Sequence, residues 1–83
     1  MNWYHGGDLL TGKPKGHYLY VTENLSAARE HAKMDHNGRV FCLRTEFAHL
    51  VTEHDKYPWS KVIKQSDLQD HGGVLSVFQE VTD

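Results

Sequence analysis

Cysteine and long apolar runs are nearly absent from this 83-residue chain, and each absence excludes a class of protein. The single cysteine, Cys42, cannot form a disulfide within the chain, which suits a reducing compartment. No apolar run approaches the roughly 18 residues that a membrane-spanning helix needs, and no signal peptide is recognised. We therefore expect a cytoplasmic protein without a membrane segment.

Charge of one sign is also scarce. The formal net charge is −2, and lysine and arginine are scattered along the chain instead of forming a block. This distribution argues against direct nucleic-acid binding, which requires a concentrated basic surface. Histidine is abundant, with seven residues, but the five-residue spacings of His31 to His36 and His49 to His54 do not place two ligands on one helix face. We expect no metal site.

The residues that are present fit one small folded domain over residues 1–83. Apolar residues make up 39% of the chain, which is too much for a disordered protein. A domain of this length buries only about 60–65% of the surface of its unfolded chain, so its core is thin. We expect Cys42, within an apolar segment, to be a small core residue.

The order of apolar segments predicts an α+β fold with one main helix and a small, mostly antiparallel sheet. Strands are expected at residues 3–5, 18–22, 39–44, 62–63 and 74–81, and the strand at 39–44 is expected to be buried on both faces. A helix capped by Thr22 or Asn24 should run to the turn at Asn37 and Gly38, with Ala28 and Ala32 on its apolar stripe. Residues 47–51 are expected to form a strand or turn, and residues 67–73 a turn.

Four short segments occur in an order that suggests a function. They are Tyr4-His5-Gly6, Gly7-Asp8-Leu9-Leu10, the Tyr-Leu-Tyr-Val-Thr-Glu-Asn-Leu-Ser-Ala-Ala run at 18–28, and Gly38-Arg39-Val40-Phe41. Together they resemble the ADP-ribosyltransferases of the His-Tyr-acid type, most closely the rifamycin-modifying ADP-ribosyltransferases in a much shortened form. The resemblance covers residues 3 to 44. It implies a minimal ADP-ribosyltransferase-like fold, NAD as substrate, and a protein target or small molecule as acceptor of ADP-ribose.

The resemblance also implies a role for individual residues in NAD binding. His5 matches the histidine that bonds the adenosine-side ribose. Gly6 matches the glycine whose bare backbone lies close to the nicotinamide amide. Tyr20 matches the tyrosine that stacks on the nicotinamide ring, with Tyr18 as the second choice. His5 and Tyr20 should therefore lie on adjacent strands and open onto one concave surface.

A carboxylate completes the catalytic set that the resemblance implies. It stabilises positive charge on the ribose in an oxocarbenium-like transition state, and it orients or deprotonates the acceptor. Asp55 is predicted for this role, with Glu53 second and Asp67 third. The predicted catalytic residues are thus His5, Tyr20 and Asp55.

Simpler interpretations of the same residues remain open. His5 next to a glycine suits a strand-end turn, one of Tyr18 and Tyr20 suits the core, and Asp55 suits a solvated loop. Cationic residues between the first two strands could meet a pyrophosphate or serve solubility; these are Lys13, Lys15 and His17.

A second hypothesis keeps the fold but not the chemistry. An inactive ADP-ribosyltransferase-like binding module could act as an inhibitor, for example a phage anti-defence (anti-CRISPR) protein. Such a module needs only an exposed patch, either aromatic at Trp3, Tyr57 and Trp59 or acidic at Glu53, Asp55, Asp67 and Asp70. NAD binding separates the two hypotheses.

Overall fold

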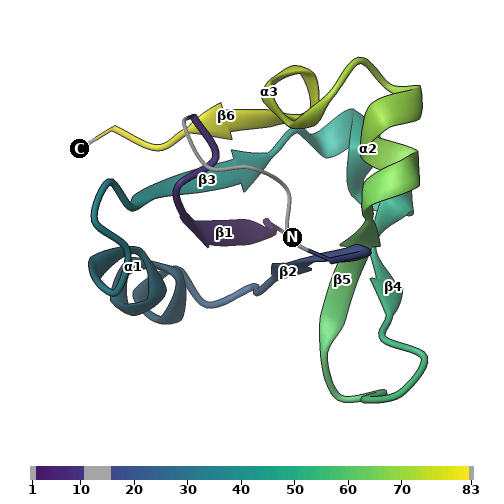
Figure 1. Ribbon diagram of the computed structural model, residues 1–83, viewed down its shortest axis with the longest axis horizontal. Helices are drawn as coiled ribbons and strands as arrows, with labels where there is room; N and C mark the ends of the chain where they lie inside the picture. Colours follow the sequence, from purple (N-terminus) through teal and green to yellow (C-terminus); the bar gives the residue numbers. More distant parts are fainter. Residues whose placement is uncertain (1, 11–15, 83) are drawn as a thin grey trace.

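The expected α+β class is confirmed in a computed structural model that describes residues 2–10 and 16–82. The strands form two three-stranded antiparallel sheets, where the sequence predicted one sheet (Figure 1). Lys13 and Lys15 lie outside the described residues. Within the described part of the chain, no helix has both the length and the apolar character needed to cross a membrane.

The first sheet has the order β1-β3-β6 and consists of β1 (Tyr4–Gly7), β3 (Arg39–Leu43) and β6 (Phe78–Glu80). Its register places His5 opposite Phe41. Strand β3 is central, but only one of its faces is fully buried: Phe41 and Leu43 are buried, whereas Cys42 is half-buried. The prediction that this strand is buried on both faces is therefore wrong, because a thin domain covers its second face only in part.

The second sheet has the order β2-β5-β4 and consists of β2 (Tyr18–Val21), β5 (Lys61–Lys64) and β4 (Thr52–Glu53). Leu19 pairs with Ile63, and both are buried in the core. Because side chains alternate along a strand, Tyr18 and Tyr20 lie on the opposite face. The interpretation that one of these tyrosines belongs to the core is wrong.

Helix α1 (Leu25–Lys33) begins at the predicted cap. The Asn24 Oδ1 atom accepts a hydrogen bond of 3.1 Å from the backbone N–H of Ala27, which satisfies one of the free donors at the helix start. Ala28 and Ala32 are buried, and the helix packs against β1 and β3. These small side chains let the helix lie close to the first sheet, which places it beside His5.

The hydrophobic core lies between the two sheets and beneath the C-terminal helices. Its buried members come from β2, β3, β5, β6 and these helices: Leu19, Val21, Phe41, Leu43, Ile63, Leu68, Val77 and Phe78. The helices are α2 (Gln65–Asp70) and α3 (Val74–Val77). Both cover the end of the molecule away from α1 in Figure 1.

The C-terminal half departs most from the sequence prediction. The strand expected at 74–81 is helical over α3 and extended only in β6, and the turn expected at 67–73 overlaps α2. Gly72 and Gly73 have φ angles of +92° and +97°, which redirect the chain before α3. Residues Thr45–Leu50 form a 3₁₀ helix, η1, where a short strand or turn was expected.

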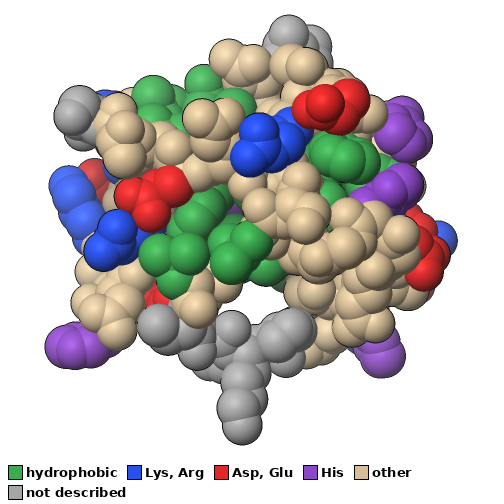
Figure 2. Space-filling model, turned by 90° about the horizontal axis from the view of Figure 1, so that it is seen from above, with side chains coloured by type: hydrophobic (Ala, Val, Ile, Leu, Met, Phe, Trp, Pro, Cys, Tyr) green, Lys and Arg blue, Asp and Glu red, His purple; other side chains and the backbone are tan. Residues whose placement is uncertain are grey.

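Charges of both signs alternate over the face shown in Figure 2. Acidic and basic side chains there sit next to one another, and apolar side chains lie between them. This face therefore carries no continuous basic surface.

Candidate functional site

The two sheets meet at the bridge between Tyr4 and Thr22, and the candidate site begins there. Tyr4 and Thr22 exchange backbone hydrogen bonds of 2.7 and 2.8 Å. In an uninterrupted antiparallel ladder, the next hydrogen-bonded pair would join Gly6 to Tyr20. Instead, His5 Nδ1 lies 2.7 Å from the carbonyl oxygen of Tyr20. The imidazole thus supplies the donor that the ladder would have supplied, and β1 and β2 separate beyond it.

This hydrogen bond fixes the tautomer of His5. A carbonyl oxygen can only accept, so Nδ1 carries the proton and Nε2 is left as the acceptor of the neutral ring. Burial lowers the pKa of His5 below its ordinary value, which favours this neutral form. The Tyr20 carbonyl and Asp35 oppose this effect, while His31 adds to it.

A cavity of about 680 Å³ opens where the two strands part. Its walls come from β1, β2, α1 and the start of β5: Trp3, Tyr4, His5, Gly6, Tyr20, Val21, Thr22, Glu23, Ala28, His31, Trp59, Ser60 and Lys61. We call it the β1–β2 cavity. Its volume lies within the range of about 300–1,000 Å³ that is usual for small-molecule sites.

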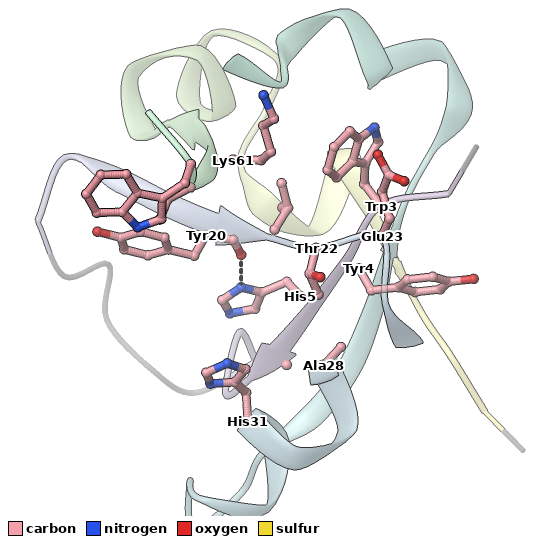
Figure 3. Close-up of a pocket in the computed structure, with 13 residues that line it drawn as sticks. Trp3, Tyr4, His5, Tyr20, Thr22, Glu23, Ala28, His31 and Lys61 are labelled. Atoms are coloured by element: carbon pink, nitrogen blue, oxygen red, sulfur yellow. Dashed lines mark hydrogen bonds between the residues drawn. The ribbon is translucent and has the colours of Figure 1, made fainter. Parts of the chain in front are cut away.

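The polar groups of the β1–β2 cavity are distributed around its wall (Figure 3). His31, from α1, lies beside His5, and the Tyr20 ring lies on the same side of the cavity as these two imidazoles. Glu23, next to Thr22 in the chain, also lines the cavity. Glu23 is the carboxylate among the described lining residues, and Asp35, which does not line the cavity, is close enough to His5 for its charge to act on the imidazole.

Gly6 has a packing role that the sequence did not indicate. A Cβ atom at this position would overlap the backbone carbonyl of Ala28 and lie 2.9 Å from the Ala32 nitrogen. The bare backbone therefore admits helix α1 against β1. Because Gly6 also lines the cavity, the contact with α1 places His31 at the cavity wall as well.

Tyr18 lies on the same face of β2 as Tyr20 but does not line the β1–β2 cavity. Its ring packs at 4.5 Å, centroid to centroid, against His54. Partial burial, followed by the charge of Asp55, raises the pKa of Tyr18 above its ordinary value. This tyrosine therefore belongs to the surface between β2 and the β4–β5 hairpin.

The three predicted acids lie away from the shared cavity of His5 and Tyr20. Asp55 is in the β4–β5 hairpin, where its side chain is 76% exposed. Glu53 is in β4 and forms an ion pair of 3.1 Å with Lys61. Asp67 is in the first turn of α2. None of the three lines the β1–β2 cavity, so the structure brings together His5, Gly6 and Tyr20 without a predicted acid.

His54 is a structural residue that the sequence analysis missed. It is only 9% exposed, and its Nδ1 atom accepts hydrogen bonds from the backbone N–H groups of Lys56 (3.0 Å) and Tyr57 (3.2 Å). Its ring stacks with Tyr20 at 6.0 Å and an interplanar angle of 13°. His54 therefore ties the hairpin turn to the cavity, although its charged neighbours Glu53 and Asp55 gave no sign of burial.

The site suits binding of an organic ligand through rings and hydrogen bonds. Tyr20 is 51% exposed and offers a ring face, while the imidazoles of His5 and His31 offer hydrogen bonds. His31 had one available signal in the sequence, since it follows Ala28 by three residues and so shares its side of the helix. Among the described residues, no group of three or more histidine, cysteine, aspartate or glutamate side chains is arranged to hold a metal ion.

Comparison with known proteins identifies no relative of this chain. No protein-family model, no curated protein and no solved structure matches it.

Proposed function

We propose that the protein binds NAD in the β1–β2 cavity and is an ADP-ribosyltransferase-like protein. The observation that carries this proposal is the hydrogen bond between His5 Nδ1 and the Tyr20 carbonyl oxygen, at the mouth of a cavity that both residues line. It joins the two residues that the sequence resemblance assigns to NAD.

The chemistry of the cavity fits the parts of NAD. The exposed ring of Tyr20 can stack on nicotinamide, and the Nε2 atom of neutral His5 can accept a hydrogen bond from a ribose hydroxyl. His31 and Lys61 also line the cavity and are donors suited to phosphate oxygens. An aromatic wall and phosphate-binding groups in one cavity are what a dinucleotide requires.

Transfer of ADP-ribose requires an acid near the ribose, to stabilise the positive charge that develops when nicotinamide leaves. Asp55, the first choice from the sequence, is outside the cavity, whereas Glu23 lines it. We therefore propose NAD binding as the primary function. If the protein also transfers ADP-ribose, the catalytic acid is a residue other than Asp55. A cytoplasmic location is part of the proposal, because NAD is an intracellular substrate and Cys42 is a free thiol.

Isothermal titration calorimetry with NAD tests the proposal. Wild-type protein should bind NAD with one site, and His5→Ala and Tyr20→Ala should each weaken binding by at least tenfold while circular dichroism stays unchanged. Leu75→Ala is the matched control, since Leu75 is exposed on α3 and does not line the cavity. Nicotinamide release, measured in the same samples, reports on transfer or hydrolysis. Absence of binding at millimolar NAD would refute the proposal.

A second candidate function is inhibition of a partner protein, as in an anti-CRISPR protein. The observation that favours it is the exposed aromatic pair at the hairpin tip, where Tyr57 and Trp59 are 40% and 78% exposed. Aromatic residues of this kind are enriched at protein interfaces. This candidate would be favoured if the wild-type protein bound a partner protein through Tyr57 and Trp59 and did not bind NAD.

A further inference from the structure

Trp59 is exposed and also lines the candidate site. It is 78% exposed, and it also lines the β1–β2 cavity with His5 and Tyr20. A single exposed apolar residue needs no explanation. Here, however, two exposed rings, Tyr20 and Trp59, stand at the wall of one cavity.

The backbone around Trp59 is held in a tight turn. The Ser60 N–H donates a hydrogen bond of 2.9 Å to the Tyr57 carbonyl oxygen, so residues 57–60 form a β-turn with Pro58 at its second position. Proline favours this position because its φ angle is already fixed. The His54 N–H in turn donates a hydrogen bond of 3.0 Å to the Ser60 carbonyl oxygen. Trp59 therefore projects from an ordered support.

Side-chain contacts connect this turn to Tyr20. The ring centroids of Trp59 and Tyr57 lie 5.5 Å apart, and those of Tyr57 and His54 lie 5.1 Å apart. The His54 ring stacks with Tyr20 at a centroid distance of 6.0 Å. The register of the second sheet brings the same segments together, because Val21 pairs with Lys61. Strand pairing and a series of packed rings therefore connect the two exposed rings.

We propose that Trp59 is the second aromatic wall for the nicotinamide ring of NAD, acting with Tyr20; this inference rests on the proposed NAD binding. The nicotinamide ring of oxidised NAD is a planar cation, and the face of tryptophan attracts cations more strongly than that of tyrosine or phenylalanine. His31 and Lys61 line the same cavity and can donate hydrogen bonds to the phosphate oxygens of NAD, although Lys61 is also paired with Glu53. A dinucleotide therefore fits the rings and the hydrogen-bond donors of the cavity.

ADP-ribose gives the sharpest test, because it is NAD without the nicotinamide ring. Trp59→Ala should weaken NAD binding by about tenfold, the loss expected for one stacked ring, and should leave ADP-ribose affinity within twofold of wild type. Trp59→Phe should retain most of the NAD affinity because it keeps a ring. Leu75→Ala, which removes another exposed apolar side chain, should change neither affinity.

Fluorescence gives an independent readout. In a Trp3→Phe background Trp59 is the remaining tryptophan, since the chain has two. NAD should quench its emission saturably, and ADP-ribose should not.

Three results would overturn the inference. In the first, Trp59→Ala binds NAD with wild-type affinity, whereas His5→Ala and Tyr20→Ala bind it more weakly. This result would exclude Trp59 from the site and would leave the proposed function unaffected. Equal losses for NAD and ADP-ribose would show that Trp59 does not act on nicotinamide. Loss of a protein partner with NAD affinity unchanged would assign Trp59 to a protein interface. Wild-type protein that binds no NAD would instead refute the proposed function itself.

Discussion

The His5 imidazole lies 2.7 Å from the Tyr20 carbonyl oxygen and replaces a backbone donor at the point where β1 and β2 separate. The His5 side chain thereby satisfies the Tyr20 carbonyl oxygen at the point where the backbone ladder ends and the cavity begins. This arrangement gives His5 a structural role that can be measured apart from any ligand.

The stability of the fold should depend on the protonation of His5. Its pKa is lowered in the folded state, chiefly by burial, relative to about 6.5 in an unfolded chain. The unfolded state therefore binds the proton more readily, so this contribution to stability is present above about pH 6.5 and is lost as the pH falls through the folded pKa. His5→Asn keeps a donor for the Tyr20 carbonyl but does not titrate. In urea unfolding between pH 7.5 and 5, the wild type should lose more stability than His5→Asn; equal pH slopes would contradict this account.

Gly6→Ala should be strongly destabilising. The added Cβ would overlap the Ala28 carbonyl, and backbone atoms of a packed helix cannot yield as a flexible side chain can. We expect a loss of about 2–3 kcal/mol in the free energy of unfolding, measured by urea denaturation. Gly16→Ala is the control: among the described residues, chain neighbours aside, no heavy atom lies within 4 Å of an added Cβ, and the φ of +73° alone should cost about 1 kcal/mol. A smaller loss at Gly6 than at Gly16 would mean that α1 is not packed on β1 as described.

His54→Ala should destabilise the β4–β5 hairpin. The substitution removes the acceptor of two backbone hydrogen bonds and the ring that stacks with Tyr20, so we expect a loss of about 2 kcal/mol. His54→Asn keeps an acceptor for the turn and should lose less. His49→Ala, at an exposed position on η1, should cost less than about 0.5 kcal/mol. Equal losses for all three variants, by chemical denaturation, would exclude the structural role of His54.

Asp55→Asn tests whether Asp55 contacts NAD, as its predicted catalytic role requires, or lies outside the site, as in the structure. Because its exposed side chain does not line the cavity, NAD affinity by calorimetry should stay within twofold of wild type. The same change should lower the pKa of Tyr18, since the Asp55 charge is one of the causes that raise it. Ultraviolet titration of the tyrosines measures this shift. An NAD affinity that falls tenfold would show that Asp55 reaches the ligand.

The sequence predicted the first half of the fold well because its signals there agree with one another. The Asn24 cap and the alanine stripe at Ala28 and Ala32 both lead to one helix packed on a sheet. In the C-terminal half they conflict. Val74 and Val77 have high β-propensity, but the glycines before them turn the chain and Val77 is buried from a helix. Packing outweighed propensity in that segment.

The candidate site was predictable only where it depends on sequence order. His5 and Tyr20 lie on neighbouring strands and line one cavity, as expected. Only the family resemblance predicted that Tyr20 faces outward; the strand pattern itself suits either Tyr20 or Leu19, and the pairing of Leu19 with buried Ile63 fixes the face. The distance of Asp55 from the cavity depends on the hairpin, whose path is set by the burial of His54.

The most direct test of the NAD site is a titration of ¹⁵N-labelled protein with NAD, followed by amide chemical shifts. The account predicts saturable shifts concentrated at residues 4–6, 20–23 and 59–61, which line the β1–β2 cavity, with little change at the C-terminal helices. Shifts confined to the helices, or no shifts at millimolar NAD, would contradict it.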